Sequence, residues 1–237
     1  MIGFLRTFFA VAVLVVVVPF AALIAFPWTL ISGRIGFLYW AGMGFTHLGV
    51  RLAGVKIKLV GLDKLDPAGT YIYMSNHVSN LDPPILAPMI PRRVSFLAKK
   101  EIWRIPILAQ ALTLAEFVPV ERRNRDSAIQ SVQRAGEVLR HGVNIALFPE
   151  GTRSPDGRLM PFKKGPFHLA AETGFPIVPV TILGTYEMMP KGNLVTKSGT
   201  VTLVFHAPID PQQFADRESL VQAVRDAVNS ALPEERR

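Results

Sequence analysis

Short apolar runs separated by helical stretches follow one another from residue 55 to the C terminus. β-Branched and aromatic side chains concentrate in runs that predict strands at residues 55–60, 71–74, 94–98, 117–120, 144–148, 177–182 and 201–205. The clearest helices are predicted between or after them, at residues 126–140, 167–173 and 218–232. This alternation is typical of an α/β domain with a mixed, mainly parallel sheet flanked by helices. The charged residues 233–237 are expected to fray.

The N-terminal part of the chain is apolar without this alternation. Residues 7–33 carry no charge, and positions 11–18 are all Val, Ala or Leu. As a helix the uncharged run would extend roughly 40 Å, more than the ~30 Å hydrocarbon core of a bilayer. Pro19 and Pro27 would kink or end it, and a second apolar stretch follows at residues 35–50. Two shapes fit: a spanning helix followed by an interfacial one, or a helix pair in one leaflet.

The net charge of +8 is distributed unevenly along the chain. Every charged residue before Asp63 is basic: Arg6, Arg34, Arg51, Lys56 and Lys58. Cations beside an apolar segment suit the anionic surface of a membrane, where each gains about 1 kcal/mol. Nucleic-acid binding would predict basic and aromatic residues interleaved on one face, so we expect no nucleic-acid partner. We expect residues 1–50 to anchor the α/β domain, residues 51–237, at the cytoplasmic face of the cell's inner (plasma) membrane.

Several classes of chemistry are disfavoured by residues that the sequence lacks. There is no cysteine, which excludes disulfides, thiolate metal ligands and an acyl-cysteine intermediate. No serine lies in a Gly-x-Ser-x-Gly pattern, and the five histidines have no metal-ligand spacing. A hydrolase with a serine nucleophile or a metal centre is therefore disfavoured, and a base that acts directly on substrate remains.

A candidate for that base follows the predicted strand at residues 71–74, which leads into Asn76 and His77. Asp82 comes five positions later, a spacing that neither a straight strand nor a straight helix places on one face. Turn-forming residues at 80–84 can bend the chain so that the two side chains meet. The carboxylate would then fix the imidazole tautomer, which makes His77 a candidate general base for a hydroxyl. A hydrogen-bonded structural histidine is the alternative interpretation.

A second candidate segment, Phe-Pro-Glu-Gly-Thr-Arg-Ser at residues 148–154, also follows a predicted strand. Gly151 allows a ligand to approach the backbone, Glu150 can accept a hydrogen bond from a substrate hydroxyl, and Arg153 offers a bidentate fork that suits phosphate. An internal ion pair between Glu150 and Arg153 is the structural alternative. Two more cations stand at the ends of predicted strands, Lys99 and Arg122, although most such side chains are simply solvated.

Taken together, these segments resemble a known family. Asn76-His77 with Asp82, spaced Asn-His-x-x-x-x-Asp, followed by the segment at residues 148–154, is similar to the glycerolipid acyltransferases, specifically the 1-acylglycerol-3-phosphate acyltransferases. The resemblance extends from about residue 57 to residue 205. It implies that His77 is the general base that activates the acceptor hydroxyl and that Asp82 orients it.

The resemblance also implies substrate-binding residues. Glu150, Gly151 and Arg153 would bind the glycerol phosphate, and two further cations would assist, Lys99 and Arg122. Arg122 ends a block that matches the family with Ala115 and Glu121 in place of its usual glycine and aspartate, which leaves the backbone setting of Arg122 open. A last apolar block of the family is matched at residues 177–180, Ile-Val-Pro-Val.

For the reaction, the family implies transfer of a fatty acyl group from acyl-ACP or acyl-CoA to lysophosphatidic acid, with the thioester as a substrate and no cofactor. The partners would be membrane lipids, lysophosphatidic acid and acyl carrier protein or a CoA thioester. Small bacterial relatives carry an N-terminal helix pair docked in one leaflet, which resembles residues 1–50. Glycerol 3-phosphate, a lyso-ornithine lipid or another lysolipid remain alternative acceptors, and a non-catalytic lipid-binding protein is the alternative from another class.

Overall fold

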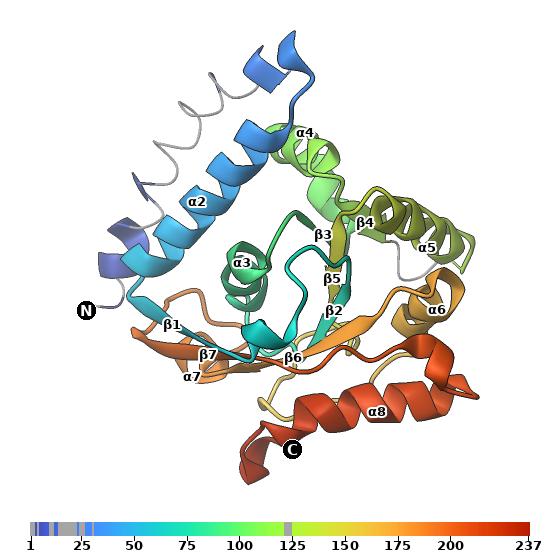
Figure 1. Ribbon diagram of the computed structural model, residues 1–237. Coiled ribbons are helices and arrows are strands. Elements are labelled where there is room, and N and C mark those ends of the chain that lie inside the picture. Colours follow the sequence, from blue (N-terminus) through green and yellow to red (C-terminus); the bar gives the residue numbers. More distant parts are fainter. Residues whose placement is uncertain are drawn as a thin grey trace.

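A seven-stranded sheet forms the centre of the protein, shown as a computed structural model in Figure 1. The structure describes residues 31–120 and 125–237, together with residues 3, 5–9, 12, 13, 23 and 27–29. The strands are β1 (Val55–Val60), β2 (Ile72–Ser75), β3 (Val94–Lys99), β4 (Val118–Val120), β5 (Asn144–Leu147), β6 (Ile177–Leu183) and β7 (Gly199–Phe205). Every strand that the apolar runs predict is therefore confirmed, with ends shifted by two residues at most.

The strand order is β1-β7-β6-β2-β5-β3-β4, and all neighbouring pairs are parallel except β6 and β7. The prediction of a mixed, mainly parallel sheet is confirmed. The antiparallel pair has a topological consequence. β6, β2, β5, β3 and β4 end at one edge of the sheet, whereas β1 and β7 begin there.

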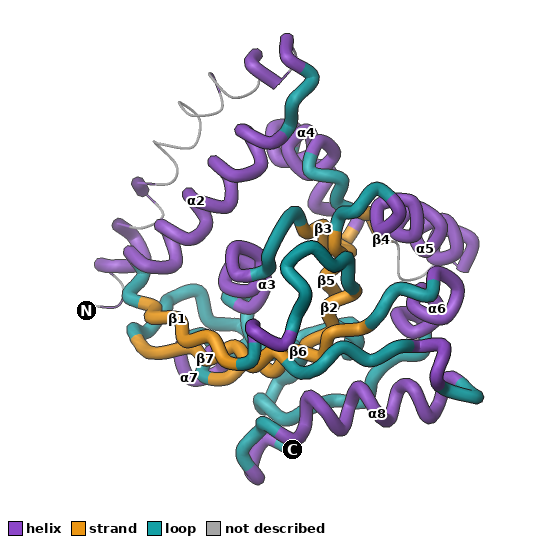
Figure 2. Tube along the Cα trace, viewed as in Figure 1, coloured by secondary structure: helices purple, strands orange, loops and turns teal. Residues whose placement is uncertain are grey.

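Helices cover both faces of the sheet, as the purple segments in Figure 2 show. The α-helices are α2 (Gly36–Leu52), α3 (Asp82–Leu86), α4 (Pro106–Leu114), α5 (Arg125–Arg140), α6 (Gly165–Thr173), α7 (Thr185–Met188) and α8 (Arg217–Ser230). Short 3₁₀ turns occur at Leu62–Lys64, Ala87–Met89, Lys100–Arg104, Pro211–Gln213 and Glu234–Arg236. The predicted helices correspond to α5, α6 and α8, whereas the prediction did not mark α4 and α7.

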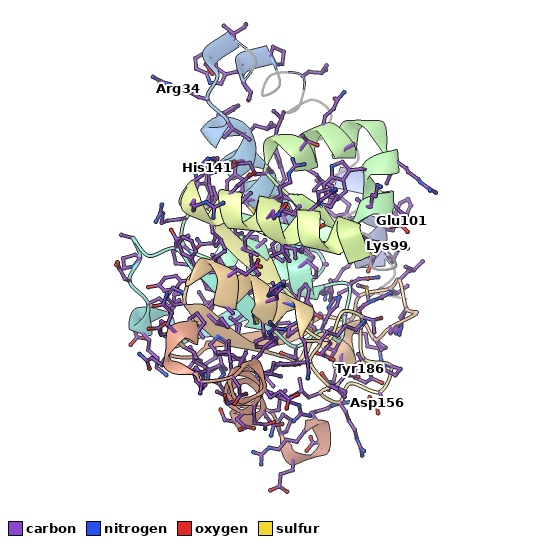
Figure 3. All side chains as sticks on the ribbon, turned by 90° about the vertical axis from the view of Figure 1, so that its right-hand side faces the viewer. Arg34, Lys99, Glu101, His141, Asp156 and Tyr186 are labelled. Atoms are coloured by element: carbon purple, nitrogen blue, oxygen red, sulfur yellow. The ribbon has the colours of Figure 1, made fainter. Side chains whose placement is uncertain are left out.

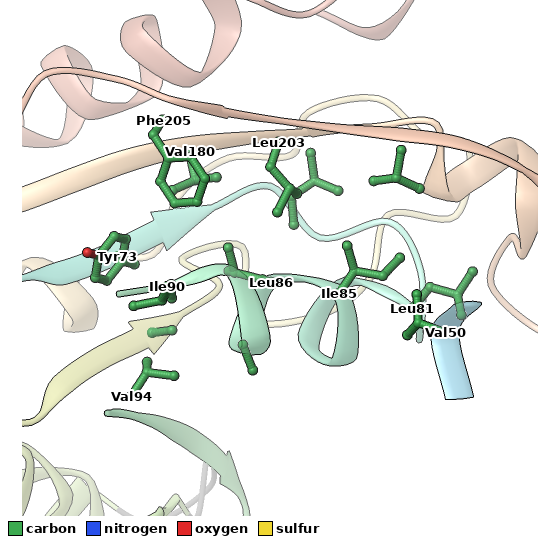
Figure 4. Close-up of a cluster of buried hydrophobic side chains, with 14 of the residues drawn as sticks. Val50, Tyr73, Leu81, Ile85, Leu86, Ile90, Val94, Val180, Leu203 and Phe205 are labelled. Atoms are coloured by element: carbon green, nitrogen blue, oxygen red, sulfur yellow. The ribbon is translucent and has the colours of Figure 1, made fainter. Parts of the chain in front are cut away.

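Two apolar cores lie on opposite faces of the sheet. On one face, residues of α2 and α3 such as Val50 and Ile85 pack with Tyr73 and Phe205 of the strands (Figure 4). On the other, α5, α6 and α8 pack against a second cluster that includes Met74 of β2. Every residue of β2 is buried, as expected for a central strand covered on both sides. Each large apolar side chain buried in this way contributes about 1.5–3 kcal/mol, so β2 is a rigid support for the residues at its carboxyl end.

The N-terminal region is described only in part. Most of the apolar run at residues 11–18 lies outside the described residues. Where residues are described, no helix has the length and hydrophobicity needed to cross a bilayer. The second apolar stretch forms α2, which joins the domain: Tyr39 is buried, and its hydroxyl accepts a 2.8 Å hydrogen bond from the Val94 N–H at the start of β3.

Candidate active site

The candidate residues of the two sequence segments gather where adjacent parallel strands end. His77 follows β2, Glu150 follows β5, and Lys99 is the last residue of β3. These three strands are neighbours, with Met74 paired to Leu147 and Phe96 paired to Ala146. The carboxyl ends of adjacent parallel strands are where α/β folds place ligands, so the location fits a reaction site.

His77 and Asp82 are in direct contact. The Nδ1 of His77 lies 2.8 Å from the Oδ2 of Asp82. Because an ionised carboxylate can only accept hydrogen bonds, this contact places the imidazole proton on Nδ1 and leaves the Nε2 lone pair free. The His77 side chain is 16% exposed and that of Asp82 is fully buried, so the aspartate lies behind a histidine that substrate can reach.

The bend that brings the pair together is built around the aspartate. Asp82 is the first residue of α3, and the prolines that follow it suit the first turn of a helix because they lack an N–H. Its Oδ2 also accepts 2.8 Å hydrogen bonds from the backbone N–H groups of Val78 and Ser79. With His77, three donors converge on this oxygen, which offsets part of the cost of taking the carboxylate out of water, while the buried Oδ1 has no hydrogen-bond partner among the described residues.

Asn76 fixes the end of β2 to the neighbouring strand. Its Nδ2 donates to the Ile182 carbonyl at 2.9 Å, and its Oδ1 accepts from the Ile182 N–H at 2.7 Å. An asparagine side chain supplies both a donor and an acceptor, as a strand backbone does. It therefore continues the hydrogen bonding between β2 and β6 beyond the end of β2. His77 therefore leaves β2 from a fixed position.

Glu150 joins the two segments from within the protein. Its Oε1 accepts a 2.7 Å hydrogen bond from the His77 N–H, and its Oε2 accepts one of 3.2 Å from the Met160 N–H. Only 2% of the residue is exposed, and burial raises the pKa of its carboxyl to about 7 although both N–H groups favour the charged form. In the structure, the Glu150 carboxyl therefore binds the backbone of His77. The sequence had led us to expect that it would bind a substrate hydroxyl. Between these two described residues, no ion pair links Glu150 to Arg153.

Phe148 supports the imidazole from the other side. The two rings are stacked, with centroids 4.0 Å apart and planes inclined by 18°. This contact fixes the ring plane of His77, while Asp82 fixes its rotation. The sequence analysis did not predict this role of Phe148. The feature that could have indicated it is the position of an aromatic residue directly after β5, the strand that pairs with β2.

The loop after Glu150 contacts the backbone of His77. The Ser154 N–H donates a 2.8 Å hydrogen bond to the His77 carbonyl, so both sides of the His77 peptide are held by this loop. Gly151 has a φ of 72°, a left-handed conformation, and a Cβ there would lie 3.0 Å from the Lys163 side chain. Arg153 is half-buried, and its carbonyl accepts a 3.0 Å hydrogen bond from the Lys191 Nζ. Lys163 and Lys191 are two cations near the loop that sequence reasoning did not single out.

The remaining predicted cations differ in their surroundings. Lys99 is 60% exposed and its Nζ lies 3.2 Å from the Oε1 of Glu101, beside which it stands in Figure 3. Arg122, together with Glu121, lies outside the described residues. Throughout the described part of the chain, no group of three or more metal-ligating side chains is close enough to hold an ion.

Comparisons with known proteins identify the family of this chain. The sequence model of the family described as Acyltransferase matches residues 56–183. A 1-acyl-sn-glycerol-3-phosphate acyltransferase of Limnanthes douglasii is 35% identical over 87% of this chain and 73% of its own length. That of Borreliella burgdorferi is 34% identical over 76% of the chain and 73% of its length. The chain belongs to the 1-acylglycerol-3-phosphate acyltransferase family.

The chain also has a structural relative. The crystal structure of the 1-acyl-sn-glycerophosphate (LPA) acyltransferase PlsC of Thermotoga maritima matches 97% of this chain and 92% of its own, with a TM-score of 0.82 and 29% identity. Relatives are found in plants, bacteria and human. The chain spans less than half the length of one chloroplastic relative, that of Brassica napus, which is 39% identical over the 45% of its length that matches.

Proposed function

We propose that this protein transfers a fatty acyl group from a thioester, acyl-ACP or acyl-CoA, to the free hydroxyl of lysophosphatidic acid and so forms phosphatidic acid. The observation that carries the proposal is the 2.8 Å contact between His77 and Asp82 at an open edge of the sheet. It leaves a basic nitrogen accessible and supports the imidazolium that forms when that nitrogen takes a proton. The names of the relatives, all glycerophosphate acyltransferases, support the choice of acceptor.

In the proposed reaction, the Nε2 of His77 removes the proton of the acceptor hydroxyl while its oxygen attacks the thioester carbonyl. A C–O bond forms, and the carbonyl electrons move to an oxyanion. When the oxyanion collapses, the C–S bond breaks, and the leaving thiolate takes the proton from His77, so that a free thiol and an ester are released. Asp82 stabilises the transient imidazolium. No acyl-enzyme and no cofactor take part.

Cations near the loop at residues 151–164 would bind the phosphate of the acceptor. Arg153 is the principal candidate because a guanidinium binds phosphate through two parallel hydrogen bonds. Lys99 ends β3, and Arg122 comes two positions after β4 in the sequence. Both would add charge. We assign Gly151 and Glu150 to shaping the loop that presents Arg153.

Residues 1–50 would hold the domain at the cytoplasmic face of the inner (plasma) membrane, as a helix pair in one leaflet. Large apolar side chains exposed in the described part of this region support an anchor: Leu5, Phe8, Phe9, Leu23, Trp28, Ile31, Phe37, Trp40 and Leu48. An anchored enzyme finds both acyl-bearing substrates concentrated in two dimensions, which supplies part of the rate.

The deciding experiment measures product formation by purified protein with lysophosphatidic acid and each thioester donor. Wild type should form phosphatidic acid, and His77→Ala should lose turnover by about a hundredfold or more while its circular dichroism and vesicle binding are retained. Glycerol 3-phosphate and a lyso-ornithine lipid are the alternative acceptors to compare. An active His77→Ala protein would refute the mechanism, and transfer to the phosphate-free lipid alone would refute the acceptor.

A further inference from the structure

A basic cavity of about 590 Å³ opens where β1 and β7 begin. Its charged lining consists of Arg6 from the N-terminal segment, Arg51 from the last turn of α2, and Lys56 from β1. No acidic side chain lines it, and among the described residues no carboxylate lies within ion-pair distance of these three cations. Three uncompensated positive charges around one hollow make it a site for an anion.

The walls of the cavity supply hydroxyl groups close to these charges. Thr200 lines it from the start of β7, and Ser198 lines it from the position just before that strand. Gly54 has a φ of 86°, and a Cβ at that position would lie 2.8 Å from the Ser198 Cβ and 3.3 Å from an Arg6 guanidinium nitrogen. The glycine therefore lets the basic and hydroxyl groups approach one another. Guanidinium, ammonium and hydroxyl donors in one hollow suit the oxygens of a phosphate.

The N-terminal segment is held at this place by specific contacts. The Thr196 N–H donates a 3.0 Å hydrogen bond to the Thr7 hydroxyl, one residue after Arg6. In Figure 1 the N-terminal helical piece lies beside the end of α2 and the start of β1. Arg6 is thus brought to the cavity by packing between segments far apart in the sequence.

The cavity is separate from His77, although it opens at the same edge of the sheet. β1 and β7 run opposite to β2, so they begin where β2 ends. The order β1-β7-β6-β2 puts three strand spacings between β1 and β2. At 4.7–4.9 Å each, these spacings amount to roughly 14 Å.

Apolar side chains are exposed on the two segments that lead into the cavity. Trp40 and Leu48 are exposed on α2, and Phe8 and Phe9 are exposed in the N-terminal segment just after Arg6. An apolar surface next to a basic cavity suits an amphiphile that has acyl chains and an anionic headgroup. A soluble phosphate would bind only in the cavity and would leave the apolar side chains uncovered.

We infer that this cavity binds the headgroup phosphate of an anionic membrane glycerophospholipid, with the acyl chains of that lipid against α2 and the N-terminal segment. The bound lipid is a fixed contact between the protein and the bilayer. It is a different molecule from the lipid substrate. It sets the height and tilt of the sheet edge that carries His77. The inference does not depend on which acceptor is acylated.

The test compares two double variants that remove equal charge. R51Q/K56Q empties the cavity of two cations, whereas K58Q/K197Q removes two exposed lysines on the adjoining segments that do not line it. Co-sedimentation of the full chain is measured with vesicles of phosphatidylcholine and of equal parts phosphatidylcholine and phosphatidylglycerol. R51Q/K56Q should weaken binding to the anionic vesicles by roughly tenfold to thirtyfold, and K58Q/K197Q by about twofold or less.

Equal weakening by both double variants would mean diffuse surface attraction and would overturn the inference. Calorimetric binding of inorganic phosphate that R51Q/K56Q loses, with no loss of vesicle binding, would assign the cavity to free phosphate and would also overturn it. Acyl transfer to a water-soluble short-chain lysophosphatidic acid should be the same in wild type and R51Q/K56Q. Loss of that activity with the fold intact would place the cavity within the reaction site and contradict a separate lipid site.

Discussion

The backbone N–H of His77 donates a 2.7 Å hydrogen bond to the buried carboxyl of Glu150, 73 residues further along the chain. The loop that contains Glu150 also holds the His77 carbonyl through Ser154. The histidine is therefore fixed at three places: its peptide by the loop, its Nδ1 by Asp82, and its ring plane by Phe148. Preorganisation of this kind is what a general base needs, and each contact can be tested separately.

Replacing Asp82 by Asn should lower kcat by about a hundredfold to ten-thousandfold, because the amide cannot stabilise an imidazolium. KM for both substrates should change little, since the Asp82 side chain is fully buried and out of substrate reach. Steady-state kinetics check this, with the exposed Asp63→Asn as a control. An unchanged kcat in a folded Asp82→Asn protein would show that the contact is structural.

Replacing Phe148 by Leu should keep most of the apolar volume and lose the stacked ring. Aromatic stacking contributes about 0.5–1.5 kcal/mol, which corresponds to a loss of kcat of roughly twofold to tenfold. Phe148→Tyr keeps the ring and should retain most of the activity. If the Leu variant matched the Tyr variant, ring stacking would not orient His77.

The stability of the protein should depend on the ionisation of Glu150. Burial raises its pKa in the folded state to about 7 from the usual 4.5, so the native state holds the proton more tightly than the unfolded chain. The resulting stabilisation is complete below pH 4.5 and is lost as the pH rises to about 7, on the order of 3 kcal/mol in all.

Denaturant unfolding of wild type and Glu150→Gln across this pH range measures the effect. The free energy of unfolding of wild type should fall relative to that of the neutral variant between pH 4.5 and 7 and then level off. Parallel pH profiles would mean that the carboxyl titrates normally in the folded protein. The exposed Glu234→Gln serves as a control.

Replacing Arg236 by Ala should loosen the loop that follows the second sequence segment. Its guanidinium carbon lies 4.4 Å from the centroid of the Tyr186 ring. The same group pairs with Glu187 at 2.7 Å and donates to the Asp156 carbonyl at 2.8 Å. We expect a loss of about 1–2 kcal/mol in unfolding free energy and faster hydrogen exchange at residues 155–162. The exposed Arg217→Ala serves as the control. Equal hydrogen exchange at residues 155–162 in both variants would show that Arg236 does not hold this loop.

The structure of the C-terminal residues also corrects an expectation from the sequence. Residues 233–237 were expected to fray because they are charged and terminal, and this is wrong: Glu234–Arg236 forms a 3₁₀ turn, and the Arg236 carbonyl accepts a 2.9 Å hydrogen bond from the Leu159 N–H. The docking depends on Tyr186 and Asp156, which are distant in the sequence and become neighbours only in the fold. Composition of the tail alone could not predict it.

The sequence predicted local features better than relations between segments. β-Branched runs marked every strand, because strand preference is carried by adjacent residues. The turn residues between His77 and Asp82 predicted the bend, for the same reason. The reversal of β7 against β6, the stacking of Phe148 and the inward orientation of Glu150 depend on which distant strands pair, which a local pattern does not encode.

The pairing of β1 with β7 bears on how the protein is made. β1 is an edge strand synthesised early, yet the strand beside it begins only at Gly199, so most of the chain must leave the ribosome before β1 is completed. Contacts between segments so distant in sequence form late in folding. The proposed anchor therefore emerges while β1, the strand that follows it in the sequence, is still unpaired, and it is free to enter the bilayer before the α/β domain has closed.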